Sequence, residues 1–453
     1  MIFSSKFGFS NEKSGIENAV ALQKAVDCGG DIYIDLPGVY ELSDTVYISD
    51  DTSIIFCNGA YIKRVKNEEE TGPVFINKGA YQRKENKNIK IIGMKLICNN
   101  VVSDGYKVGC NKGILGLSAH VAFYYVKNLE IRDFEVHDLP PKDFGIQVCN
   151  FDNILIENGV IEGLKDGIQL GTGSKFTIRH FKFSTFDDPI ALNAHDYAIS
   201  NPEMGWIENG IIEDCYDLDD NSTTGFFCRI LAGSWKNWEK GMVIQNSDSV
   251  IYDGKIYRAF MRPDGKVYTS HEKPDNQVGA ENSDGIVWCM TQENTINNCG
   301  CRNIIFRDIF LQKKRPIAFS IHFDKDEWSR SYYPNSEAPL QENITFENIY
   351  CQNDIPILLH SRTPMNNIRF TNCHLNGNAI KIEDIDTDGI EYKTINIGFD
   401  KTCFSKSERN LIESDKNIPV NLQISNSFAE SGFKARLLGN IDLKTSDIDC
   451  EKL

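Results

Sequence analysis

A short alternation of apolar and polar residues recurs along this chain and predicts β-strands. Each copy begins with Asn, continues with an apolar–x–apolar alternation and ends with Asn or Asp. Clear copies start at Asn128, Asn153, Asn303, Asn343 and Asn367, with weaker variants at 175–178 and 205–209. Because successive side chains of a strand point to opposite faces, a period of two predicts strands with one buried face.

A second phrase follows the first and reads Gly or Pro, Ile, any residue, then an apolar residue. Its copies start at Gly145, Gly167, Pro189, Gly285, Pro316 and Pro356. The spacing from Gly145 to Gly167 and from Gly167 to Pro189 is 22 residues. Two short strands in each repeat of this length are typical of a β-helix coil. We therefore predict an all-β fold, a single-stranded right-handed parallel β-helix.

The remaining segments are expected to close or decorate one solenoid domain over residues 1–453. The stretch 18–26 has an apolar helical face and predicts a helix that caps the N-terminal end, within a cap region 1–50. The stretch 401–453 is polar and irregular, and we expect a C-terminal cap there. Residues 232–282 leave the repeat and carry two turn signals, which predicts an inserted pair of hairpins.

The insertion is rich in aromatic residues, among them Trp235, Trp238 and Tyr257. Aromatic rings on a protruding loop suit stacking on sugar rings, so we expect these three to contact substrate. Two alternatives stay open. The rings either pack on one another and on the flank of the coils, or form a contact between copies of the chain in a homo-oligomer.

Composition narrows the classes of partner. Lys and Arg number 48 against 64 for Asp and Glu, which gives a net charge of -16. Such a field repels nucleic acid and anionic lipid, and the chain has no apolar run long enough to span a membrane. Cys149, Cys228, Cys289, Cys351 and Cys373 lie inside strand patterns, where a free thiol acts as a small buried apolar group. We therefore expect a reduced, cytoplasmic protein, unless a secretory leader has been trimmed.

Aspartates precede several copies of the second phrase. Equivalent positions on adjacent coils lie about 4.8 Å apart, so Asp166, Asp188 and Asp284 are expected to form a ladder, with Asp187 beside it. Stacked carboxylates repel, which raises the pKa of at least one. Carboxylates of unequal pKa are what cleavage of a glycosidic bond requires. The alternative is structural, because Asp before Gly is also a common turn residue.

These residues resemble motifs of the polygalacturonase-like enzymes, glycoside hydrolase family 28, within the pectate-lyase-like β-helix superfamily. Lys165-Asp166-Gly167-Ile168 is followed one coil later by Phe186-Asp187-Asp188, and then by Cys228-Arg229-Ile230. The resemblance implies that Asp188 is the general acid and that Asp166 and Asp187 activate water. It also implies an inverting mechanism, with Arg229 binding substrate.

The chain departs from the family at several positions. It has no Gly-His-Gly motif, and Leu231 stands where the family has a lysine that binds a uronate. His195 and His322 are the histidines we consider instead as substrate contacts.

We expect a glycoside hydrolase acting on an oligosaccharide or polysaccharide, without a cofactor or metal. One alternative is a β-helix polysaccharide lyase or fructotransferase-like enzyme, for which the Asp ladder would hold calcium. A second is a carbohydrate-binding or tailspike-like solenoid without enzymatic activity.

Overall fold

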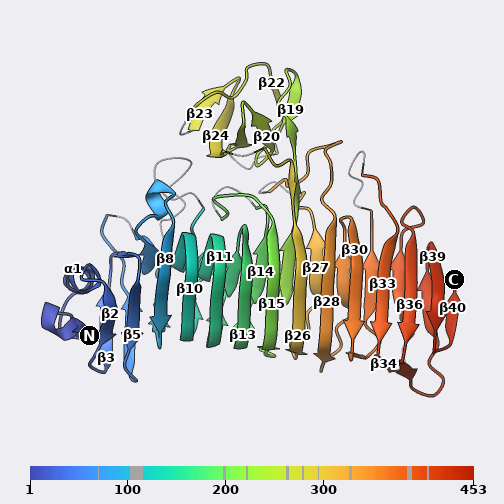
Figure 1. The fold of residues 1–453 in the computed structure, drawn as a ribbon, viewed down its shortest axis with the longest axis horizontal. Helices are drawn as coiled ribbons and strands as arrows, with labels where there is room; N and C mark the ends of the chain where they lie inside the picture. The colour runs from blue at the N-terminus through green and yellow to red at the C-terminus, as the bar shows by residue number, and fades with distance from the viewer. Residues whose placement is uncertain are drawn as a thin grey trace.

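A computed structural model describes the chain except residues 70, 103–115, 197–199, 221–222, 262–264, 278–279, 294, 326–328, 385–389 and 406–407. Within the described residues, 31 strands join one sheet whose neighbours pair in parallel. Figure 1 shows these strands stacked side by side along the long axis. Strands at equivalent positions pair coil after coil along the long axis. The all-β prediction and the parallel β-helix are therefore confirmed.

The strands of the solenoid fall into three stretches of the chain. The first contains β1 (Ile2–Phe3), β2 (Gly30–Ile34), β3 (Gly38–Leu42), β4 (Val46–Ile48), β5 (Thr52–Phe56), β6 (Ala60–Arg64), β7 (Phe75–Asn77), β8 (Asn86–Ile92) and β9 (Lys95–Ile97). The second contains β10 (Ala119–Leu139), β11 (Phe144–Gly163), β12 (Ile168–Leu170), β13 (Gly173–Thr185), β14 (Ile190–Asn193), β15 (Ile207–Asp217) and β16 (Cys228–Leu231). The third contains β26 (Cys301–Leu311), β27 (Ile317–His322), β28 (Gln341–Cys351), β29 (Ile357–Ser361), β30 (Met365–Thr371), β31 (His374–Leu375), β32 (Ala379–Ile382), β33 (Ile395–Asp400), β34 (Cys403–Phe404), β35 (Ile412–Ser414), β36 (Val420–Ser425), β37 (Phe428–Ala429), β38 (Ala435–Leu438), β39 (Ile441–Ser446) and β40 (Cys450–Lys452).

The recurring Asn of the first phrase forms a ladder on the outside of the coils. Asn128 and Asn153 have φ of 56° and 64°, a left-handed conformation that Asn tolerates better than most residues. The side-chain amide of Asn153 donates to Asn128 over 2.8 Å, and that of Asn128 donates to Asn88 over 2.9 Å. The conformation at each coil corner and the amide ladder thus explain why Asn opens the phrase.

The apolar positions of the same phrase stack inside the coils. Phe306, Phe346, Phe370 and Phe399 are fully or almost fully buried. Successive rings in this row lie 5.3, 4.9 and 4.9 Å apart and nearly parallel. Because each ring is supported by the equivalent ring of the next coil, the core is continuous along the solenoid.

The two ends of the chain differ from each other. At the N-terminus, α1 (Gly15–Val26) begins with a capping box between Ser14 and Glu17 and buries one face against β2, β3 and β4, next to the short 3-10 helix η1 (Ser4–Phe7). A second 3-10 helix, η2 (Ala80–Gln82), follows β7.

Residues 401–453 are not irregular, because β34 to β40 continue the parallel pairing almost to the C-terminus.

The inserted segment is a small, mainly antiparallel unit outside the solenoid (Figure 1). Its strands are β17 (Gly233–Ser234), β18 (Lys236–Asn237), β19 (Met242–Ile244), β20 (Ser249–Tyr252), β21 (Lys255–Ala259), β22 (Tyr268–Ser270), β23 (Ala280–Ser283), β24 (Ile286–Gln292) and β25 (Asn298–Cys299). The strand after Gly285, expected to belong to a coil, is β24 and pairs antiparallel with β21 and β23 instead. The insertion therefore extends past residue 282.

The thirteen cysteines among the described residues are all free thiols, and Cys228, Cys351 and Cys373 are buried in the core of the coils as expected. Cys149 is buried in a separate apolar cluster with Tyr124 and Phe144. Cys289 is also free and buried, but it lies in β24 of the insertion.

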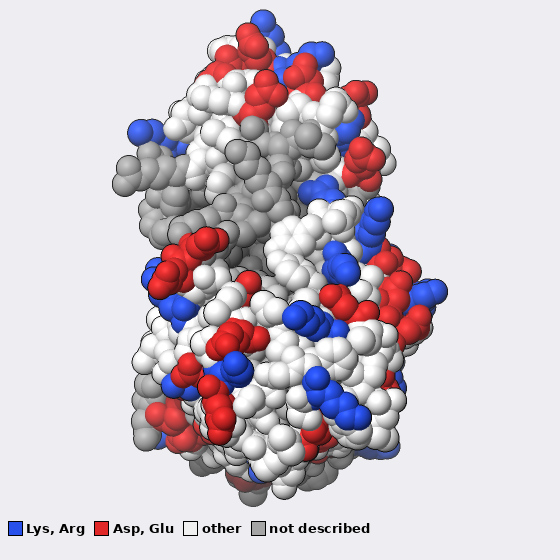
Figure 2. Space-filling view, turned by 90° about the vertical axis from the view of Figure 1, so that its left-hand side faces the viewer, with Lys and Arg blue, Asp and Glu red and all other residues white. Residues whose placement is uncertain are grey.

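No helix among the described residues is long and apolar enough to cross a membrane. Among the described residues on the N-terminal face, Lys and Arg side chains are intermixed with Asp and Glu side chains (Figure 2).

Candidate active site

The coil register brings Asp166 and Asp188 together. Ile168 pairs with Ile190 across β12 and β14, and the amide of Gly167 donates to the carbonyl of Asp188 over 2.9 Å. The two aspartates therefore occupy the same position on consecutive coils. One carboxylate oxygen from each of Asp166, Asp187 and Asp188 lies within 4.8 Å of the others, so the three carboxylates converge as the sequence predicted.

Two cations lie among the three carboxylates. Nζ of Lys165 is 3.1 Å from Oδ1 of Asp166 and forms an ion pair with Asp187. Nε of Arg229 is 3.3 Å from Oδ2 of Asp188, and its Nη2 is 3.9 Å from Oδ2 of Asp166. Asp166 and Asp188 are almost fully buried, whereas the side chain of Asp187 is 24% exposed. Asp187 is thus the member of the trio most accessible to water or a ligand.

The three aspartates have unequal acidities. Burial raises the pKa of Asp188 to about 8, and the charges of Asp166 and Asp187 add to this effect while Arg229 opposes it. Burial also raises the pKa of Asp166, against the effect of Lys165. For Asp187, burial acts in the same direction, but the Lys165 ammonium outweighs it and lowers the pKa. At neutral pH, Asp188 is therefore the protonated member and Asp187 an ionised one.

The next coil forms a close wall against the carboxylates. The amide of Phe226 donates to Oδ1 of Asp188 over 2.7 Å. Gly225, with φ of 67°, passes so near that a Cβ there would lie 2.4 Å from Oδ1 of Asp188 and 2.6 Å from Oδ1 of Asp187. A side chain at residue 225 would displace both groups, so the glycine fixes how closely the wall approaches.

A polar network centred on Asp196 holds the guanidinium of Arg229 in position. It lies in β16, opposite Ala191 of β14, and its Nη2 is 3.5 Å from Oδ2 of the fully buried Asp196. Asp196 also accepts hydrogen bonds from Asn193 (2.8 Å) and Ser200 (2.9 Å). The network orients the guanidinium toward the carboxylates.

Sequence reasoning missed two charged residues of this site. Lys165 is adjacent to Asp166 in the chain and lies 22 residues before Asp187, which is the spacing of the repeat. The repeat therefore places Lys165 next to Asp187 on the preceding coil, and this spacing could have identified it. Asp196 carries no comparable signal, because it follows β14 in a segment without a repeat.

His322 lies beside Arg229 on the following coil. Arg229 pairs with Ser320 across β16 and β27, and Oγ of Ser320 is 2.9 Å from Nδ1 of His322. Nε2 of His322 is 3.3 Å from Oδ1 of Asp324. Burial lowers the pKa of His322, although Asp324 opposes the shift, so this histidine is a neutral neighbour of the site.

His195 and Asp284 do not join the site. His195 is buried, with its Nε2 3.4 Å from Oγ of Ser249 in the insertion, and burial lowers its pKa far below the ordinary value. Asp284 lies at the turn between β23 and β24, where it accepts the amides of His271 and Glu272 over 2.7 and 2.6 Å. Asp284 therefore stabilises a turn of the insertion and is not the next member of the aspartate ladder.

Of the three aromatic residues expected to contact substrate, two belong to the apolar cluster of the insertion, and Trp235 belongs to the core of the solenoid. Trp235 and Tyr257 are 1% exposed. Tyr257 packs with Ile244, Val250 and Trp288, and Trp238 borders the same cluster with its indole N–H donating to Ser270 over 2.9 Å. The alternative in which the rings pack on one another or on the flank of the coils is thus correct for both buried rings. Tyr257 packs inside the insertion, and Trp235 packs in the core of the solenoid.

The insertion nevertheless contacts the segment whose Asp196 pairs with Arg229. Nη1 of Arg258 donates to the carbonyl of Asn201 over 2.9 Å, and the side-chain amide of Gln292 donates to the carbonyl of Met204 over 2.7 Å. Asn201 in turn donates to the carbonyl of Asn193. The insertion therefore packs on the segment that follows β14 and carries Asp196.

Solved structures with the same architecture are known. An exopolygalacturonase from Thermotoga maritima aligns over 95% of this chain and 92% of its own, with a TM-score of 0.50 and 11% identity. Gene product 12 of bacteriophage phi29 aligns over all of this chain and 56% of its own, with a TM-score of 0.53 and 13% identity. A family 28 exopolygalacturonase from Yersinia enterocolitica aligns over 99% of this chain and 79% of its own, with a TM-score of 0.47 and 13% identity.

This chain shares the fold of an exopolygalacturonase. At such low identity the similarity shows the fold alone, and the phage protein has the same fold. No family model matches the chain, and no curated protein matches it in sequence.

Proposed function

We propose that this chain is a glycoside hydrolase that cleaves a glycosidic bond of an oligosaccharide or polysaccharide. The observation that carries the proposal is the opposite direction of two pKa shifts within one trio, upward for Asp188 and downward for Asp187. A protonated carboxyl beside an ionised carboxylate supplies the acid and the base that the reaction requires.

In this mechanism Asp188 donates its proton to the glycosidic oxygen as the bond from that oxygen to the anomeric carbon breaks. Asp187 removes a proton from the water whose oxygen bonds to the anomeric carbon. Lys165 keeps Asp187 ionised. The guanidinium of Arg229 points toward the trio and holds the side chain of Asp188 in place. Asp166 contributes negative charge that favours the protonated form of Asp188.

The resemblance to family 28 implies inversion at the anomeric carbon. Carboxyl groups of inverting enzymes are usually about 6.5–9.5 Å apart, whereas oxygens of this trio lie within 4.8 Å of one another. We therefore assign the water to the exposed side of Asp187 and not to a gap between the carboxylates. NMR of the first anomer released is expected to show inversion, and retention would make Asp187 the nucleophile.

The calcium-dependent lyase is less well supported. The trio offers converging oxygens that a cation could use, but Lys165 and Arg229 already contact all three carboxylates. Calcium requires six to eight oxygen ligands at about 2.3–2.6 Å and would have to displace both side chains.

The proposal is tested by incubating the protein with uronic, neutral and fructan oligosaccharides and weighing the products by mass spectrometry. Hydrolysis adds one water for each bond cleaved, a lyase leaves an unsaturated sugar, and a cyclising transferase adds nothing. We expect hydrolysis that is unaffected by a calcium chelator and absent from the Asp188→Asn variant. Unsaturated products, or chelator-sensitive turnover, would contradict the proposal.

A further inference from the structure

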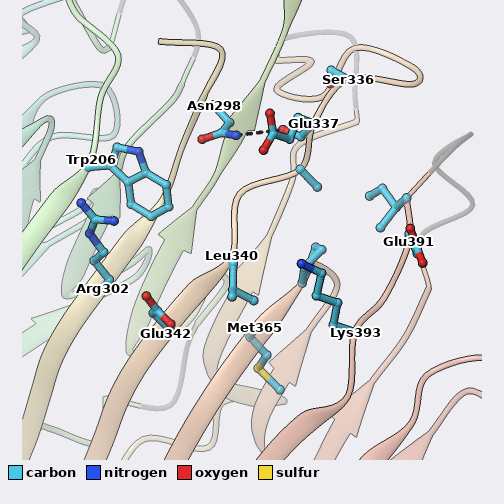
Figure 3. Close-up of a pocket in the computed structure, with 13 residues that line it drawn as sticks. Trp206, Asn298, Arg302, Ser336, Glu337, Leu340, Glu342, Met365, Glu391 and Lys393 are labelled. Carbon is cyan, nitrogen blue, oxygen red and sulfur yellow. Dashed lines mark hydrogen bonds between the residues drawn. The ribbon is translucent and has the colours of Figure 1, made fainter.

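A cavity lies on the solenoid away from the three carboxylates. It has a volume of about 490 Å³, within the range of sites that bind small ligands. It is lined at the segments that lead into β15, β26, β28, β30 and β33 (Figure 3). The trio, in contrast, precedes β12 and β14, so one column of short strands separates the two places.

The cavity has an aromatic wall. Ile207 pairs with Cys301, so Trp206 occupies the position of Gly300 on the next coil. The Arg302 guanidinium lies over the indole ring, 4.7 Å from its centroid. In Figure 3 the indole projects toward the cavity, with Asn298 above it and Arg302 and Glu342 below. Trp206 is the lining aromatic ring and is only partly buried.

The opposite wall is held in place by hydrogen bonds. The carbonyl of Glu337 accepts the hydroxyl of Ser234 over 2.6 Å and the side-chain amide of Asn298 over 3.1 Å. The side chain of Asn297 donates to the Glu337 carboxylate over 3.1 Å. These hydrogen bonds fix the position of Glu337 in the wall of the cavity.

The lining chemistry is apolar in part and acidic at the rim. Leu340 and the buried Met365 provide apolar surface. The charged lining residues are three acids, Glu337, Glu342 and Glu391, and two bases, Arg302 and Lys393. Arg302 already forms an ion pair with Glu208 on the preceding coil. A negatively charged ligand would therefore meet a surplus of carboxylate.

We propose that this cavity is a second carbohydrate-binding site, which takes a neutral sugar unit stacked against Trp206 with its hydroxyls donating to the rim carboxylates. An aromatic platform bordered by hydrogen-bonding side chains matches the alternation of C–H faces and hydroxyls on a pyranose. The site does not rest on the proposed hydrolase, because binding there is measured without turnover.

The test uses the full chain carrying Asp188→Asn and isothermal titration with three neutral probes, cellohexaose, xylohexaose and mannohexaose, and with the galacturonate hexamer. We expect at least one neutral hexasaccharide to bind, and Trp206→Ala to weaken that binding about tenfold, or about 1.4 kcal/mol. Trp206→Phe is expected to retain most of the affinity. Phe428→Ala, which removes an exposed ring on β37, is the matched control and should change nothing.

Three outcomes would overturn the inference. They are the absence of binding by all three neutral probes, equal affinities of Trp206→Ala and its parent, and tighter Trp206-dependent binding of the galacturonate hexamer than of every neutral probe. Thermal unfolding of each variant separates lost binding from lost structure. The two proposals fail in different measurements. Failure of the hydrolase proposal appears as missing hydrolysis products, and it leaves the titration result unchanged.

Discussion

Nε of Arg229 lies 3.3 Å from Oδ2 of Asp188, and yet the pKa of Asp188 is raised. A cation at this distance favours the ionised carboxylate, so the burial of Asp188 and the charges of Asp166 and Asp187 must outweigh it. The aspartate is therefore held as a neutral acid in a site that contains two cations. The predictions below follow from this balance.

The pH dependence of turnover should be bell-shaped. Activity requires Asp188 protonated and Asp187 ionised. It should therefore fall as pH rises through about 8, the pKa of Asp188, and fall again only below the ordinary range of Asp, because Lys165 lowers the pKa of Asp187. Initial rates on the substrate found by the product screen measure both limbs. A single rise toward alkaline pH would contradict the assignment.

Replacing Asp188 with Asn keeps the shape of the side chain and removes its proton. We expect turnover to fall roughly 10²-fold or more, with folding intact by circular dichroism. The loss should shrink for a substrate with a good leaving group, such as an aryl glycoside, because that oxygen needs no proton. Equal losses on both substrates would argue against a role for Asp188 as general acid.

Lys165→Met should shift the acidic limb of the pH profile to higher pH. The variant removes the main effect that lowers the pKa of Asp187 and leaves burial, which raises it, opposed by Arg229 and Asp166, so less of the base is ionised in mildly acidic solution. Lys175→Met is the matched control, because Lys175 pairs with the more exposed Asp152 on the outside of the coils. The control should leave the profile unchanged, and an unchanged profile for both variants would remove Lys165 from the mechanism.

Gly225→Ala should impair turnover more than stability explains. Its Cβ would lie 2.4 Å from Asp188, and such a displacement of a reacting group costs on the order of tenfold or more in rate. Gly254→Ala shares the left-handed strain, with φ of 73°, but meets no atom within 4 Å. Both variants should lose about 1–2 kcal/mol of unfolding free energy, and only Gly225→Ala should lose activity beyond that expected from partial unfolding.

The repeat made the fold and the meeting of the aspartates predictable from sequence. Equal spacing from Gly145 to Gly167 to Pro189 sets the register, and the register alone places Asp166 beside Asp188. The same reasoning failed at Gly285, because any half-buried strand shows the local pattern. The spacing from neighbouring copies, which β24 does not keep, is what distinguishes a coil.

Side chains that act across coils were harder to predict. Trp235 and Tyr257 looked like exposed ligand contacts because the residues that bury them are distant in the sequence. Tyr257 packs with Trp288 of the insertion, and Trp235 packs in the core of the solenoid. Asp196 reaches Arg229 only because the segment after β14 folds back over the coil. Contacts of this kind depend on tertiary packing and leave no period in the sequence.

The protonation of Asp188 can be measured without knowing the substrate. The infrared difference between the wild-type protein and Asp188→Asn isolates the vibrations of this carboxyl group. At pH 6 the account predicts the carbonyl band of a protonated acid, which gives way to carboxylate bands as the pH passes through about 8, the pKa of Asp188. Carboxylate bands already present at pH 6, with no change up to pH 9, would contradict the central claim that Asp188 is a neutral general acid.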